Sequence, residues 1–186
     1  VTAGGKLLAL GRVPQLFQGR GDALDVVLLI DESLSMLRTD PNRLRVQAAK
    51  TFVDLAYRSQ RIRRIGVVAF NDRARPLIPL TSLARVQDLR DAVEKITNDS
   101  QTDMDQALDL ARGLLEGSDA SAGKAVLLLT DGKDEPGRYE NAHLPFADRR
   151  WRVFTVGLSA RADHEVLSRI AHDTGGNLAE SLEGLA

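Results

Sequence analysis

The sequence has no cysteine among its 186 residues, and only 4% of its residues are aromatic. The absence of cysteine excludes disulfide bonds, thiol catalysis and thiolate metal sites, and it leaves the redox character of the compartment open. Basic and acidic side chains nearly cancel, at 25 against 26. Because the chain has neither a basic stripe nor many aromatic residues, we expect no nucleic-acid partner.

Long hydrophobic runs are also missing. No uncharged apolar run approaches the roughly 20 residues that cross a bilayer, and the first residues lack the apolar block of a signal peptide. We therefore expect no direct insertion of this segment into a membrane. The chain starts at Val1 rather than Met, as a piece of a longer protein would, so a missing signal says nothing about the parent protein.

Four short runs are rich in Val, Leu, Ile and Phe and are nearly continuous rather than alternating, at residues 25–30, 64–70, 124–130 and 152–158. This pattern predicts strands with both faces covered, as in parallel sheets. The run from Arg75 to Leu80 follows the second strand too closely for a helical crossover, so we predict an antiparallel strand there. Its prolines place it at the sheet edge. Residues 177–181 predict a last short strand.

Apolar residues recur at helical spacing between these runs. The predicted helical stripes run through Leu44 to Leu55, Leu83 to Ile96, Met104 to Leu115 and Val166 to Ala171. For the first helix, Asp40 is the predicted N-cap and Pro41 the first helical residue. Alternating strands and helices predict an α/β fold: a Rossmann-like, three-layer open sheet, mainly parallel with one antiparallel edge strand, with helices on both faces.

The domain organisation follows from the same pattern. Residues 1–20 show no clear period and read as a lead-in or linker segment, and residues 21–186 are predicted to form one domain. The last residues, Leu182 to Ala186, predict the start of a final helix that the chain does not finish. We expect the isolated domain to be monomeric.

Oxygen-bearing side chains gather where predicted strands end or helices begin, and open parallel sheets bind ligands at the carboxyl ends of their strands. Two carboxylates and three hydroxyls are expected at that edge, with no His or Cys among them. Such hard oxygen donors suit Mg²⁺, Mn²⁺ or Ca²⁺ better than Zn²⁺ or Cu²⁺. The predicted metal ligands are Asp31, Ser33, Ser35, Thr102 and Asp131.

In this arrangement the sequence resembles a von Willebrand factor A domain with a complete metal ion-dependent adhesion site (MIDAS). The motif D-x-S-x-S spans Asp31 to Ser35, Thr102 lies in the loop before a helix, and Asp131 ends a strand in "TDG". The resemblance covers about Asp25 to the C-terminus. It implies that the serines and the threonine contact the ion, that the aspartates act directly or through water, and that a partner's Glu or Asp carboxylate completes the octahedron.

The resemblance also bears on the source and compartment of the chain. Residues 40–52, "DPNRLRVQAAKTF", resemble membrane-anchored bacterial members of the family. We therefore expect a bacterial protein with a membrane-associated parent. An extracytoplasmic location, at the cell surface or in the periplasm, is favoured over the cytoplasm.

The function implied is a metal-dependent protein-binding module, and not an enzyme, that holds Mg²⁺, with Mn²⁺ or Ca²⁺ as alternatives. A second hypothesis is a subunit that assists an AAA+ ATPase, as relatives with metal chelatases and MoxR-type ATPases do. The third is a Mg²⁺-dependent phosphohydrolase with Asp31 as nucleophile. Such enzymes usually carry an acid where this chain has Ser33, whose hydroxyl cannot act as a general acid or base near neutral pH.

Each candidate ligand also has a structural interpretation that the sequence leaves open. Ser33 and Ser35 are typical of turns and caps. Thr102 with Asp105 fits a helix capping box, and Asp131 with the next glycine fits a turn. Among the neighbours, Glu32 is expected to be solvated or near the rim, and the three histidines (His143, His164 and His172) are expected at the surface or on helices.

Overall fold

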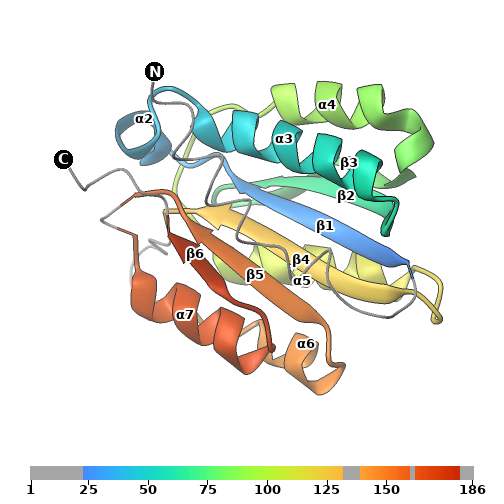
Figure 1. Cartoon of the computed structure of the whole chain (residues 1–186). Helices are drawn as coiled ribbons and strands as arrows, with labels where there is room; N and C mark the ends of the chain where they lie inside the picture. The colour runs from blue at the N-terminus through green and yellow to red at the C-terminus, as the bar shows by residue number, and fades with distance from the viewer. Residues whose placement is uncertain (1–22, 132–138, 160–161, 181–186) are drawn as a thin grey trace.

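The computed structural model of the chain describes residues 23–131, 139–159 and 162–180 (Figure 1). The predicted lead-in over residues 1–20 and the predicted start of a final helix at Leu182 to Ala186 lie outside this range. The elements are β1 (Leu24–Asp31), α2 (Met36–Thr39), α3 (Leu44–Ser59), β2 (Ile62–Phe70), β3 (Ala74–Ser82), η2 (Leu83–Arg85), α4 (Val86–Glu94), α5 (Met104–Glu116), β4 (Gly123–Thr130), α6 (Leu144–Asp148), β5 (Arg152–Gly157), α7 (His164–Asp173) and β6 (Leu178–Glu180).

The sheet has six strands in the order β3-β2-β1-β4-β5-β6. All neighbours pair in parallel except β2 and β3, which are antiparallel. The predicted mainly parallel sheet with one antiparallel edge strand is therefore confirmed. Pro76 and Pro79 lie on β3, where a missing amide hydrogen is tolerated because the strand has a neighbour on one side only.

Helices cover both faces of the sheet, as Figure 1 shows, with α3 and α4 on one side and α5, α6 and α7 on the other. Alternate residues of β1 enter two separate cores. Leu28 packs with the core that contains Phe52 of α3, and Leu29 packs with the core that contains Leu108 of α5. The three-layer Rossmann-like prediction is confirmed, and the double burial explains the continuous apolar runs.

The first long helix differs from its prediction. It begins at Leu44 rather than at Pro41, and Leu55, predicted to be buried, is 37% exposed. The buried face is instead Arg45, Val46, Ala49, Phe52, Val53 and Ala56. This second stripe also has helical spacing, so periodicity alone did not separate the two. The predicted N-cap is wrong as well, because Arg43 occupies that position. The Asp40 carboxylate nevertheless accepts hydrogen bonds from the first two amides of the helix, those of Leu44 and Arg45, at 2.6 and 2.9 Å.

The strand order creates a switch point between β1 and β4. The chain leaves β1 toward β2 on one side, and it returns through α5 to place β4 on the other side. Ligands of open α/β sheets bind at the carboxyl ends of strands at such a point. Among the described residues, no helix combines the length and apolar character needed to cross a bilayer.

The backbone of Gly176, in the turn between α7 and β6, lies close to the backbone of β5. A Cβ added there would lie 2.0 Å from the carbonyl oxygen of Val153, whereas a Cβ at Gly113, in the exposed face of α5, meets nothing within 4 Å. We expect Gly176→Ala to lower the free energy of unfolding by about 2 kcal/mol, because overpacking forces the backbone to move. Gly113→Ala should raise it by about 0.5–1 kcal/mol by increasing helix propensity.

Urea unfolding of the two variants measures both effects. Similar stability for Gly176→Ala and the wild type would show that this part of the chain adjusts without cost.

Candidate metal centre

Asp31 is the last residue of β1, and its side chain is fully buried. Its Oδ1 accepts a hydrogen bond from the Ser33 amide at 2.8 Å, and its Oδ2 accepts one from the Thr130 hydroxyl at 2.5 Å. Thr130 ends β4, which pairs with β1 in parallel. Strand pairing and two hydrogen bonds therefore fix the orientation of this carboxylate.

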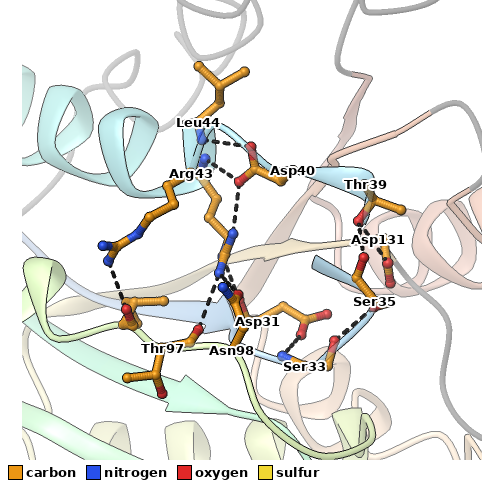
Figure 2. A network of polar contacts seen from close by, with 12 residues as sticks. Asp31, Ser33, Ser35, Thr39, Asp40, Arg43, Leu44, Thr97, Asn98 and Asp131 are labelled. Carbon is orange, nitrogen blue, oxygen red and sulfur yellow. Dashed lines mark hydrogen bonds and ion pairs between the residues drawn. The ribbon is translucent and has the colours of Figure 1, made fainter. Parts of the chain in front are cut away.

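The two serines of the motif turn their hydroxyls toward each other, with 2.9 Å between the Oγ atoms (Figure 2). Ser33 is 1% exposed and Ser35 is half-buried. Ser35 occupies the N-cap position of α2, but its side chain makes no cap hydrogen bond. Ser35 is therefore the N-cap by position, but its hydroxyl does not cap the helix and instead faces the hydroxyl of Ser33.

Asp131 follows β4 directly and is fully buried. The Thr39 hydroxyl donates hydrogen bonds to Asp131 Oδ2 at 3.2 Å and to the Ser35 carbonyl at 3.1 Å. In Figure 2 the carboxylate of Asp131 lies beside Thr39, on the same side as the two serines. Thr39, which sequence reasoning missed, thus connects the two halves of the site. A lone threonine in a short helix gave no sign of this role.

Thr102 lies in the loop before α5 and is 5% exposed. The N-cap of α5 is Asp103, whose carboxylate accepts from the Gln106 amide at 2.9 Å, so the predicted capping box with Thr102 as N-cap is wrong. Two backbone hydrogen bonds hold this loop against the serine loop: Leu34 N to Ser100 O at 3.0 Å and Asp99 N to Glu32 O at 2.7 Å. These bonds place the loop that leads to Thr102 beside the loop of the two serines.

The two carboxylates interact electrostatically. The pKa of Asp31 is raised from 3.8 to about 6, mainly because the carboxyl group is buried and also because Asp131 is charged. Hydrogen bonds from Ser33 and Thr130 oppose this rise by stabilising the ionised form. Two buried carboxylates are costly unless a cation compensates them, and the donor set fits a hard divalent ion.

The candidate metal ligands are all oxygen atoms, and only two of the five side chains carry a negative charge. Among the described residues there is no group of three or more His, Cys, Asp and Glu side chains that could hold a metal. Within the described part of the chain, the other candidate oxygen-bearing side chains at this edge are hydroxyls, which can supply ligands in addition to the two carboxylates. Oxygen-only coordination with few charges suits Mg²⁺ or Mn²⁺.

Glu32 differs from its prediction. It was expected to be solvated or near the rim, but it is 2% exposed. Its carboxylate accepts hydrogen bonds from Arg75 of β3 at 3.0 and 2.9 Å and from the amide and hydroxyl of Thr97, both at 3.1 Å. Its partners lie more than 40 positions away in the sequence, which is why sequence reasoning could not pair it.

Arg45 and His143 are buried as well. Arg45 has no exposed surface although it is an arginine in a helix, and its guanidinium forms a salt bridge of 3.0 Å with Asp40. His143, expected at the surface or on a helix, is fully buried immediately before α6, where its ring nitrogens contact the Tyr139 hydroxyl at 2.7 Å and Asp173 at 3.1 Å.

With this geometry described, the comparisons with known proteins identify the class of the chain. The model of the von Willebrand factor type A domain matches residues 25–182, and the chain belongs to this family. Matrilin-1 of Gallus gallus is 27% identical over 153 residues, which cover 80% of this chain and 31% of that protein. An uncharacterized protein of Synechocystis is 27% identical over 161 residues, covering 84% and 37%. The chain thus spans about a third of these relatives.

Two solved structures with the same fold contain metals, according to their descriptions. Manganese-loaded TRAP protein of Plasmodium vivax has a TM-score of 0.71 at 21% identity, covering 81% of this chain and 63% of that one. Proximal thread matrix protein 1 from the mussel byssus, with a zinc-occupied MIDAS motif, has a TM-score of 0.66 at 24% identity, covering 87% and 42%. At these identities the likeness shows the fold.

The raised pKa of Asp31 predicts an unusual dependence of stability on pH in metal-free protein. Between pH 5 and 7 this carboxyl ionises in the folded chain, whereas in the unfolded chain it is already ionised above pH 5. Its contribution to the free energy of unfolding therefore falls by about 1 kcal/mol as the pH rises from 5 to 7. Asp31→Asn removes the titrating group, so its stability relative to the wild type should be about 1 kcal/mol greater at pH 7 than at pH 5.

Urea unfolding of both proteins in a metal chelator, at the two pH values, measures this difference. Equal pH dependence in the two proteins would mean that Asp31 ionises in its ordinary range.

Proposed function

We propose that this domain is a metal-dependent protein-binding module and not an enzyme. In the proposed complex, a divalent cation, Mg²⁺ in the first instance, is bound at the carboxyl edge of the sheet. An acidic side chain of a protein partner occupies the remaining coordination position. The residues that would hold the ion are Asp31, Ser33, Ser35, Thr102 and Asp131.

The observation that supports this proposal most directly is the pair of fully buried carboxylates at the ends of adjacent strands. Asp31 and Asp131 repel each other, and burial disfavours the charge of Asp31. A dication compensates both charges, so metal binding and ionisation of Asp31 favour each other. The metal-containing TRAP and byssus structures, which share the fold, support the proposal independently.

The chain's own side chains prepare the site. Thr130 and Thr39 each donate a hydroxyl proton to one aspartate, which fixes the carboxylates and leaves other lone pairs of their oxygens for an ion. The serine hydroxyls supply neutral oxygen. With only two carboxylates to compensate its charge, a bound dication would act as an acceptor of a third, external carboxylate.

The surface beside the serines is open to a partner. Leu34, which lies between the two serines, is 52% exposed, and Leu37 of α2 is 54% exposed. Exposed aliphatic side chains at such a position are more useful for binding a macromolecule than for excluding water from a reaction. Ser33, which is buried beside Asp31, supplies no acid for phosphoryl chemistry.

Metal titration tests the ligand set. By isothermal calorimetry, we expect the wild type to bind Mg²⁺ or Mn²⁺, Asp31→Ala to show no binding at millimolar metal, and Thr102→Val to lose at least about tenfold in affinity. Loss of residues that only orient metal ligands already costs about 10–100-fold. Thr81→Val is the matched control, because Thr81 is a buried threonine of β3 that is 7% exposed and donates its hydroxyl proton to the Pro79 carbonyl at 2.8 Å.

Absence of metal binding by the wild type would overturn the proposal. Equal loss of affinity in Thr81→Val and Thr102→Val would attribute the effect to general destabilisation of the fold.

The open coordination position can be tested with Mn²⁺, whose bound water relaxes solvent protons. We expect excess acetate to lower the water-proton relaxation rate of the Mn²⁺-loaded domain, because the carboxylate replaces bound water. Acetamide, which has a similar shape and no charge, should leave the rate unchanged. Electron paramagnetic resonance of free Mn²⁺ serves as the control, since it shows whether acetate has removed the ion. Equal responses to both compounds would contradict selection of an acidic group.

A further inference from the structure

Thr102 and Asp31 are separated by about 70 residues in the sequence. The position of the loop that carries Thr102 relative to β1 therefore depends on contacts between residues distant in sequence. Besides the backbone hydrogen bonds at Asp99 and Ser100, side-chain contacts hold this loop at Thr97, which lies just after α4. They come from two side chains that are themselves attached to the end of β1.

Arg45 provides the first attachment. Its Nε donates a hydrogen bond to the Asp31 carbonyl at 2.8 Å, and its Nη1 binds Asp40 at 3.0 Å. Its Nη2 donates to the Thr97 carbonyl at 3.3 Å and also to Asn98 Oδ1. One rigid group thus connects the backbone of Asp31 to the loop of Thr102.

Glu32 provides the second attachment, from the residue directly after Asp31. Its Oε2 accepts hydrogen bonds from both the amide and the hydroxyl of Thr97, each at 3.1 Å. The Glu32 carbonyl also accepts from the Asp99 amide at 2.7 Å. The peptide groups on either side of Thr97 are therefore held at the amide by Glu32 and at the carbonyl by Arg45.

We propose that Arg45 and Glu32 are positioning residues that set the separation between Asp31 and Thr102, and hence the affinity of the site for a divalent cation. This inference rests on the proposed function of the domain. Neither side chain is among the proposed metal ligands. Both act through the loop, in the way that residues behind a metal site commonly orient its ligands.

An arginine is required at position 45 by its shape. Its four acceptors lie in different directions, and a guanidinium has five N–H groups in a fixed planar fork that can reach them together. A lysine at this position keeps the charge near Asp40 but has a single flexible ammonium group. Arg45→Lys should therefore keep the ion pair and lose contacts to the loop.

The experiment compares Arg45→Lys and Glu32→Gln with Arg64→Lys. Arg64 makes a two-bonded contact to the buried Asp25 at 3.2 and 2.6 Å, near the opposite end of β1. Arg64→Lys therefore controls for replacing an arginine that contacts a buried aspartate by lysine, at a position far from the site. Mn²⁺ affinity is measured by calorimetry, thermal stability by calorimetric melting, and amide hydrogen exchange of residues 98–103 by mass spectrometry in metal-free protein.

We expect Arg45→Lys and Glu32→Gln to bind Mn²⁺ at least about tenfold more weakly than the wild type and to exchange faster at residues 98–103. Arg64→Lys should keep wild-type affinity and wild-type exchange there, whatever its melting temperature. If Arg45→Lys does not fold, Glu32→Gln decides the outcome. Wild-type affinity in the folded variants would overturn the positioning role while leaving the proposed function intact. Absence of Mn²⁺ binding by the wild type would instead overturn both.

Discussion

Parallel pairing of β1 with β4 is the constraint on which the site depends. The register Ile30 to Leu129 ends the two strands at nearly the same level, so Asp31, the last residue of β1, and Asp131, the residue after β4, lie at one edge of the sheet. The apolar residues before them are buried on both faces, and this burial makes the strand ends rigid. Two carboxylates are thereby held in a region from which water is largely excluded. The hydroxyl groups of Thr130 and Thr39, which donate hydrogen bonds to these carboxylates, partly compensate for the lost water.

Burial of the two aspartates lowers the stability of the metal-free fold, and the same burial would favour binding of a cation. Burial raises the pKa of Asp31 because the fold disfavours its charge. A fold selected for stability alone would replace such a residue with an uncharged one. Under the proposed function, the free energy that two adjacent buried aspartates give up in the metal-free state would be recovered when a cation is bound.

The fold could be predicted from the sequence to a large extent because its signals are local. Continuous apolar runs, helical stripes and the closely spaced prolines of β3 correctly predicted the sheet, its one antiparallel edge and its two helical layers. The surroundings of the site could not be predicted in this way. Glu32 and Arg45 are charged residues in polar contexts, and only the folded chain brings them to Thr97, which is 65 and 52 positions away. Periodicity likewise did not distinguish two overlapping apolar stripes on α3.

The edge strand β3 has a consequence for how other proteins can associate with this domain. Exposed edges invite further strands to pair with them, which leads to sheet extension and aggregation. Pro76 and Pro79 remove two amide hydrogens from β3. Arg75, which precedes Pro76 on the same strand, adds a positive charge, and its side chain is 47% exposed. On this side the domain resists backbone pairing, so recognition is left to side chains and does not proceed by adding a strand to the sheet.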